Sequence, residues 1–136
     1  MFDGNVILGH IEGTTNHFVV KSNFVYISER YRIEVRAGLE TDGASVPRIF
    51  WNIFPPVSGR YLEAAVLHDA LYASKLIDRK EADKIFLEAM KDLGVSLWKR
   101  KVMYWAVRAF GKKAWKSHDI MSVSKARRYV KVSKLA

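Results

Sequence analysis

The sequence predicts an α+β fold: a small N-terminal antiparallel β-sheet, an ordered Pro/aromatic loop, a three-helix bundle and a basic C-terminal arm. Three observations lead to this prediction. Apolar side chains recur with the period of a strand before residue 39 and with the period of a helix after residue 59, and all the excess positive charge lies near the C-terminus. The chain has 136 residues and is 49% hydrophobic, so we expect a single domain over residues 1–136.

The β part is expected to occupy residues 1–38. Apolar and charged side chains alternate through YRIEVRAG at 31–38, which is typical of a half-buried strand with Tyr31, Ile33 and Val35 on its inner face. The β-branched and aromatic stretch HFVVKSNFVYI at 17–27 predicts a strand before it, with residues 28–30 as the hairpin connection. GNVILGHI at 4–11 is a further candidate strand.

Residues 39–59 are expected to form a structured loop. The segment LETDGASVPRIFWNIFPPVSG contains all three prolines of the chain, which interrupt helices and central strands. Three aromatic side chains between them, Phe50, Trp51 and Phe54, predict that the loop is pinned to the rest of the domain.

The helical part is expected at residues 60–115. The first helix covers 60–75, and Asp78 is the predicted N-cap of a second helix that ends at Gly94. Ser96 is the candidate cap of a third helix, LWKRKVMYWAVRAFGKKAW. Its apolar stripe predicts a core face, or an amphipathic face that seeks a membrane, since basic residues flank it. The stripe consists of Trp98, Val102, Trp105, Ala106, Ala109 and Phe110.

The charge is distributed unevenly. Residues 1–90 contain ten Lys/Arg and twelve Asp/Glu, whereas residues 91–136 contain thirteen and two, a net of +11. The basic end at 116–136 is expected to be an edge strand or an arm that orders on a partner. We therefore expect an anionic partner, either a lipid surface or an acidic neighbouring subunit. The sequence matches no groove-binding motif, which argues against sequence-specific nucleic-acid binding.

Some classes of protein are excluded or disfavoured by composition. There are no cysteines, which excludes a disulfide scaffold and a thiolate metal site. No apolar run reaches the roughly 18 residues that a transmembrane helix needs. The first residues lack a basic region followed by a long apolar region, so no signal peptide is expected.

Two titratable residues stand side by side in the first predicted helix. In AAVLHDALY, His68 and Tyr72 share a helical face and Asp69 lies one step round. An antiparallel second helix would bring Asp83 opposite His68, where a carboxylate can fix the tautomer and support an imidazolium. Asp69 would then be available to a cation or to the TDGAS loop, in which Asp42 is the candidate to meet it.

A structural interpretation stays open beside this one. In it, His68 donates to a backbone carbonyl and Asp69 accepts from loop amides or from Arg79, so that the residues staple the loop to the helix. A catalytic role requires His68 to face a solvent-reachable cavity, whereas a structural role has it packed under the loop aromatics. Ser45 in TDGAS lacks a G-x-S-x-G context and is expected to be a turn or cap residue.

AA-x-x-HD-x-x-Y followed by AD-x-x-F resembles the phospholipase A2 superfamily. The resemblance implies that His68 is the general base, that Asp83 orients it and that Tyr72 supports the pair. It also implies a calcium ion held by Asp69 and the loop, with Asp42 as a further candidate ligand. The loop GLETDGAS has fewer glycines than the calcium loop of that superfamily, which puts the metal site in doubt.

The motifs TDGASVP, HDALY and RKEADKIF also resemble an uncharacterised family of tailed-phage and prophage proteins, over about residues 33–115. Together, the two resemblances imply a phage-type protein, in the virion or the host cytoplasm, that hydrolyses an ester of envelope lipid with calcium. The alternative is a non-enzymatic virion component of tail, baseplate or capsid, whose His–Asp cluster is structural and whose basic C-terminus docks a neighbouring subunit.

Overall fold

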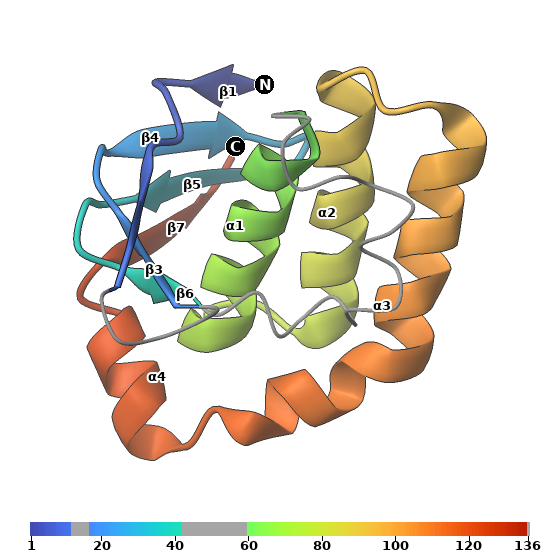
Figure 1. The fold of residues 1–136 in the computed structure, drawn as a ribbon. Helices are drawn as coiled ribbons and strands as arrows, with labels where there is room; N and C mark the ends of the chain where they lie inside the picture. The colour runs from blue at the N-terminus through green and yellow to red at the C-terminus, as the bar shows by residue number, and fades with distance from the viewer. Residues whose placement is uncertain (12–16, 42–59, 136) are drawn as a thin grey trace.

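The computed structural model describes residues 1–11, 17–41 and 60–135, and Figure 1 shows their arrangement. The strands are β1 (Phe2–Asp3), β2 (Leu8–His10), β3 (Phe18–Val20), β4 (Phe24–Ile27), β5 (Tyr31–Val35), β6 (Glu40–Thr41) and β7 (Val130–Lys134). The helices are α1 (Arg60–Ser74), α2 (Arg79–Asp92), α3 (Leu97–Ser117) and α4 (Ile120–Ala126). The predicted α+β class is confirmed.

The strands form two antiparallel sheets, one in the order β1-β4-β5-β7 and one in the order β2-β3-β6. The predicted alternation in β5 is confirmed, because Ile33 and Val35 are buried while Arg32 is exposed. The hairpin connection is also confirmed: the Ser28 N–H donates to the Tyr31 carbonyl at 2.8 Å. This tight turn aligns β4 with β5 and sends their inner side chains into the common core.

The single strand expected at 17–27 is in fact two strands that belong to different sheets. β3 lies in the smaller sheet and β4 in the larger one. The chain turns at residues 21–23, where the Lys21 N–H bonds to the Ile7 carbonyl and the Asn23 side chain accepts from the Ala37 N–H. Strand propensity alone does not reveal such a corner, since the residues on both sides favour strands equally.

The three predicted helices are present, but they lie in a row and do not close into a bundle (Figure 1). α2 packs between α1 and α3, and α1 also packs against α4, a short helix that the sequence did not predict. The predicted cap of α2 is confirmed, since Asp78 Oδ1 accepts from the Glu81 N–H at 2.8 Å. Gly94, at φ +81°, follows α2 as expected, whereas the Ser96 side chain makes no capping hydrogen bond.

The C-terminal segment joins the N-terminal sheet. β7 pairs antiparallel with β5, placing Val130 opposite Val35 and Val132 opposite Ile33. Of the two alternatives for the basic end, the edge strand is therefore the one that forms, and α4 leads into it. The expected order of the Pro/aromatic loop lies outside the described residues, except that β6 pairs with β3 at its start.

The prediction that the aromatic stripe of α3 is a core face is wrong. Trp98 is 62% exposed, Trp105 67% and Phe110 60%. The side of α3 that is buried carries small or flexible residues instead: Met103, Ala106, Val107, Gly111 and Ala114. Large aromatic residues suggest a buried face, but the buried side of this helix carries smaller side chains, and Trp98 and Trp105 face solvent whereas Trp115 packs edge-on against Tyr72. Within the described residues, no helix is long and apolar enough to cross a membrane.

Candidate His–Asp active site

α1 and α2 bring His68 and Asp83 into direct contact. His68 Nε2 lies 2.7 Å from Asp83 Oδ1, and both side chains are 0% exposed. The two helices are joined by only four residues, 75–78, so they run antiparallel and place a residue near the middle of each on the shared face. Helix periodicity predicts that these two side chains face each other, and the contact confirms it.

Tyr72 contacts both members of the His68–Asp83 pair. Its hydroxyl donates to Asp83 Oδ1 at 2.6 Å, and its ring centroid lies 4.2 Å from that of His68. Phe86 approaches the imidazole with a centroid distance of 4.6 Å. The imidazole is therefore held by two rings and one carboxylate, which leaves it little freedom to rotate.

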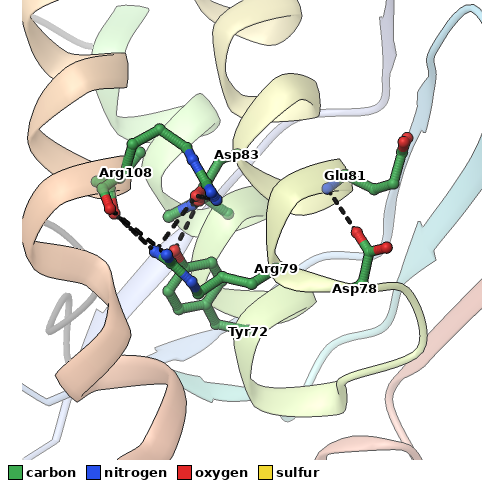
Figure 2. A network of polar contacts seen from close by, with 8 residues as sticks. Tyr72, Asp78, Arg79, Glu81, Asp83 and Arg108 are labelled. Carbon is green, nitrogen blue, oxygen red and sulfur yellow. Dashed lines mark hydrogen bonds and ion pairs between the residues drawn. The ribbon is translucent and has the colours of Figure 1, made fainter.

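Two arginines bind the other side of the carboxylate (Figure 2). Arg108 Nη1, from α3, donates to Asp83 Oδ2 at 2.8 Å, and Arg79 Nη1 lies 3.6 Å from the same oxygen. Arg79 also donates to the Val107 carbonyl at 3.1 Å. The cluster therefore ties three helices together at one ionised group.

Electrostatics at the pair favour a neutral imidazole beside a carboxylate. Burial disfavours the imidazolium and holds the pKa of His68 below its usual value, although Asp83 acts in the opposite direction. Burial also raises the pKa of Asp83, but the hydrogen bonds from His68, Tyr72 and Arg108 outweigh it and keep that pKa below its usual range. Arg79 and Arg108 already offset the negative charge of the Asp83 carboxylate. Protonation of His68 would add a third positive charge, with little further electrostatic stabilisation.

The tautomer of His68 follows from these contacts. An ionised carboxylate only accepts hydrogen bonds, so Nε2 must carry the proton that it donates to Asp83. Nδ1 then carries no hydrogen and has a free lone pair. It is buried without a hydrogen-bond partner in the described part of the chain. Such a lone pair can accept a proton from a water molecule only if water reaches it.

Asp69 lies next to the pair but points to a different element. Its Oδ2 accepts from Thr41 Oγ1 at 2.6 Å, which links α1 to the end of β6 and to the segment that follows. The other expected members of this region, Asp42 and Ser45, lie outside the described residues, as do the three loop aromatics. Hence the hydrogen bond from Thr41 joins Asp69 to the start of the TDGAS loop.

One detail of the structural interpretation is wrong. The described hydrogen bond of the His68 ring goes to the Asp83 carboxylate and not to a backbone carbonyl. Arg79, one of the two alternative partners expected for Asp69, donates to carbonyls of α3 and approaches Asp83. The other alternative, the amides of the TDGAS loop after Thr41, lies outside the described residues. The polar cluster is therefore centred on Asp83.

Asp69 is the expected calcium ligand that lies within the described residues. Calcium takes six to eight oxygen ligands, and the Asp69 carboxylate is a suitable hard donor. Elsewhere among residues 1–11, 17–41 and 60–135, no group of three or more His, Cys, Asp or Glu side chains is placed to hold a metal. A carboxylate oxygen suits calcium, but one carboxylate does not make a site. Asp42, the other expected ligand, lies outside the described residues.

A groove of about 530 Å³ lies elsewhere, between the β4–β5 turn, α2 and the start of α3. Its walls carry both signs of charge, with Arg30, Glu81 and Glu88 among the lining residues. Neither His68 nor Asp83 lines it, so the solvent-reachable cavity that a catalytic His68 requires is not this groove.

Two residues of the cluster, Arg108 and Gly111, were missed from the sequence, and Arg79 was assigned to Asp69 instead of Asp83. Arg79 stands four residues before Asp83, which is the spacing of a helical ion pair and would have indicated it. Gly111 lies inside a helix, where glycine is costly, and this hinted at a close approach; a Cβ there would lie 2.6 Å from Tyr72 Oη. Arg108 had no local signal, because its partner is 25 residues away on another helix.

These features define an α+β domain in which a buried His–Asp pair joins two antiparallel helices. The chain belongs to the family described as "Protein of unknown function (DUF1353)", whose sequence model matches residues 18–107. The matched region includes His68, Asp83 and Arg79 but not Arg108, and it ends before α4 and β7.

Two curated relatives come from Sinorhizobium fredii (strain NBRC 101917 / NGR234). Uncharacterized protein y4jT is 41% identical over 78 residues, which are 57% of this chain and 23% of that protein. Uncharacterized protein y4iH is 30% identical over 112 residues, which are 81% of this chain and 47% of that protein. The chain thus spans less than half the length of either relative. No solved structure matches it.

Proposed function

We propose that this domain is a hydrolase of lipid esters whose His–Asp pair works as in the phospholipase A2 superfamily that its helices resemble. One observation carries the proposal: Nδ1 of His68 is buried and has no hydrogen-bond partner among the described residues, while Nε2 lies 2.7 Å from Asp83 Oδ1. The low pKa of His68 keeps the imidazole in the basic form at neutral pH.

In the proposed reaction, Nδ1 of His68 takes a proton from water while the water oxygen bonds to the ester carbonyl carbon. Asp83 accepts from Nε2–H and stabilises the imidazolium, and Tyr72 and Arg108 hold the carboxylate in place. The tetrahedral intermediate then expels the alkoxide, which takes the proton from Nδ1. The products are a free fatty acid and an alcohol, and His68 returns to its neutral form.

Calcium is a separate part of the proposal. When bound, it would polarise the ester carbonyl as a Lewis acid. Asp69 would hold it together with Asp42 and backbone oxygens of the TDGAS loop. The hydrogen bond from Thr41 to Asp69 supports this arrangement, because it brings the start of that loop to the carboxylate.

The setting we propose is a bacteriophage or prophage, with the protein in the virion or the host cytoplasm and the bacterial envelope as the source of lipid. This part rests on the TDGASVP, HDALY and RKEADKIF motifs. The net charge of +11 in residues 91–136 supports an anionic partner.

The test is hydrolysis of phosphatidylglycerol vesicles and of a short-chain soluble ester, each with calcium and with a chelator. We expect His68→Gln to lower the rate at least about 100-fold and Asp69→Asn to abolish the response to calcium. His17→Gln, at an exposed histidine, is the matched control and should leave the rate unchanged. If folded wild type hydrolyses neither substrate with or without calcium, the hydrolase proposal fails.

A second candidate is favoured by the complete burial of His68 and Asp83, since a substrate must reach a catalytic base. In this candidate the cluster only locks α1, α2 and α3 together, and the protein is a virion structural component of tail, baseplate or capsid. An inactive wild type combined with strong destabilisation by Asp83→Asn would support it. A calcium-dependent rate that disappears in folded His68→Gln would contradict it.

A further inference from the structure

The outer side of α3 combines exposed tryptophans with lysines. Trp98, Trp105 and Ala109 are exposed together with lysines at helical spacing, and none of them belongs to the buried side of α3. We call this surface the outer α3 face; it consists of Trp98, Lys101, Trp105, Ala109, Lys112 and Lys116. α3 stands at the end of the row of helices (Figure 1), and the side chains of this face are exposed to solvent.

Two large indole rings of α3 are left mostly in solvent. They are 62% and 67% exposed and lie two turns apart on the same side of α3, about 10 Å along its axis. Large indole rings in water cost free energy unless a partner covers them. Their repetition on one side indicates a binding surface.

The charge of α3 identifies the chemistry of the partner. The helix contains seven Lys or Arg residues and no Asp or Glu. Arg108 is bound to Asp83, and the lysines of the outer α3 face point to solvent with the tryptophans. Indole rings favour the depth of lipid headgroups, and lysine side chains can reach anionic headgroups from the same depth.

We propose that the outer α3 face docks the protein on an anionic lipid surface, with Trp98 and Trp105 inserted among the headgroups and Lys101 and Lys112 paired with lipid phosphates. The inference deepens the proposed function by naming the surface that would meet a lipid substrate, and it rests on that function only for the identity of the substrate. Arg108 projects from the same helix to Asp83, so the docked helix is also one that holds the His–Asp pair.

The experiment is co-sedimentation of the full chain with vesicles of phosphatidylcholine alone or mixed with phosphatidylglycerol, at about 0.1 M salt. We expect binding to the anionic vesicles only. Trp98→Ala/Trp105→Ala and, separately, Lys101→Glu/Lys112→Glu should each weaken this binding at least about tenfold.

Matched controls distinguish binding through the outer α3 face from non-specific vesicle binding by exposed apolar or basic side chains. Ile120→Ala/Met121→Ala removes two apolar side chains that are even more exposed, on α4. Lys21→Glu/Lys80→Glu reverses two exposed charges away from α3. Both controls should bind as wild type does. Equal losses in the controls, or full binding by the outer α3 variants, would overturn the proposal. So would a wild type that binds heparin or an acidic protein through this face and ignores vesicles.

Two further measurements keep this test independent of catalysis. Vesicle binding by His68→Gln should equal that of wild type, since the pair is buried away from the surface. Hydrolysis of the soluble short-chain ester by the outer α3 variants should also be unchanged. If the wild type binds anionic vesicles but hydrolyses nothing, the docking surface stands and the hydrolase proposal fails.

Discussion

At the residue scale, Asp83 organises the cluster more than His68 does. Its two oxygens accept from His68, Tyr72 and Arg108, at 2.6 to 2.8 Å. A buried carboxylate is stable only when such donors replace its water. The same donors keep it ionised, and an ionised Asp83 fixes the proton of His68 on Nε2.

The titration of His68 should appear in the stability of the protein. Its pKa is lowered on folding, so the unfolded chain binds a proton near the usual value of 6.5 while the folded chain does not. The stability from neutral His68 is therefore complete above pH 6.5 and is lost as the pH falls below it. Asp83, whose pKa is also lowered, adds a second loss below about pH 3.8.

The measurement is the free energy of unfolding in urea from pH 8 to pH 4.5 for wild type and His68→Gln. We expect the wild type to lose stability below pH 6.5 and the variant, which has no titrating group at this position, to lose much less. Curves that run parallel over this range would show that His68 is not held neutral in the folded state.

At the element scale, the close packing of α3 on the other helices depends on small residues. Gly111 stands where a Cβ would meet Tyr72 Oη at 2.6 Å and Arg79 Nη1 at 3.3 Å. Tyr72 is fully buried and hydrogen-bonded, so its hydroxyl cannot move aside easily. This contact explains why α3 places a glycine, and not a larger residue, against Tyr72.

Gly111→Ala is therefore expected to destabilise the protein by about 1–3 kcal/mol through overpacking, although helix propensity alone would stabilise it by about 1 kcal/mol. Combining it with Tyr72→Phe, which removes the atom that the new methyl group meets, should give less than the sum of the two losses. Urea unfolding of the two single variants and the double variant tests this. Strict additivity would mean that the clash with Tyr72 does not set the packing distance.

At the scale of the whole molecule, the ends of the described chain meet in one sheet. β7 pairs with β5 and packs near α1, so the last residues complete a sheet that the first residues begin. The family match stops at residue 107, so β7, which completes the sheet, lies outside the matched region.

Val130 is 4% exposed and faces the core from β7, so Val130→Asp should lower the free energy of unfolding by roughly 3 kcal/mol. Ser133→Asp is the control, because that side chain is exposed on the same strand opposite Arg32. It should change stability by less than about 0.5 kcal/mol. Thermal or urea unfolding distinguishes the two; similar small effects would mean that β7 contributes little to the fold.

Local patterns were sufficient for much of the architecture and for the core of the candidate site. The alternation of β5, the cap at Asp78 and the helix ends depend on neighbouring residues, whose spacing is visible in the chain. His68, Tyr72 and Asp83 were found for the same reason, since they lie on regular helices joined by a short turn.

Features that depend on distant contacts needed the tertiary structure. The corner between β3 and β4 depends on strands that pair in different sheets. Arg108 bonds to Asp83, which is 25 residues away on another helix. The exposure of Trp98 and Trp105 depends on which side of α3 packs on its neighbours. A helical pattern tells which residues share a side, but the packing of neighbouring elements selects which side is buried. The sequence therefore established the α+β class and the residues of the His–Asp pair. The burial of that pair, its two arginines and the exposed face of α3 followed from how the helices pack.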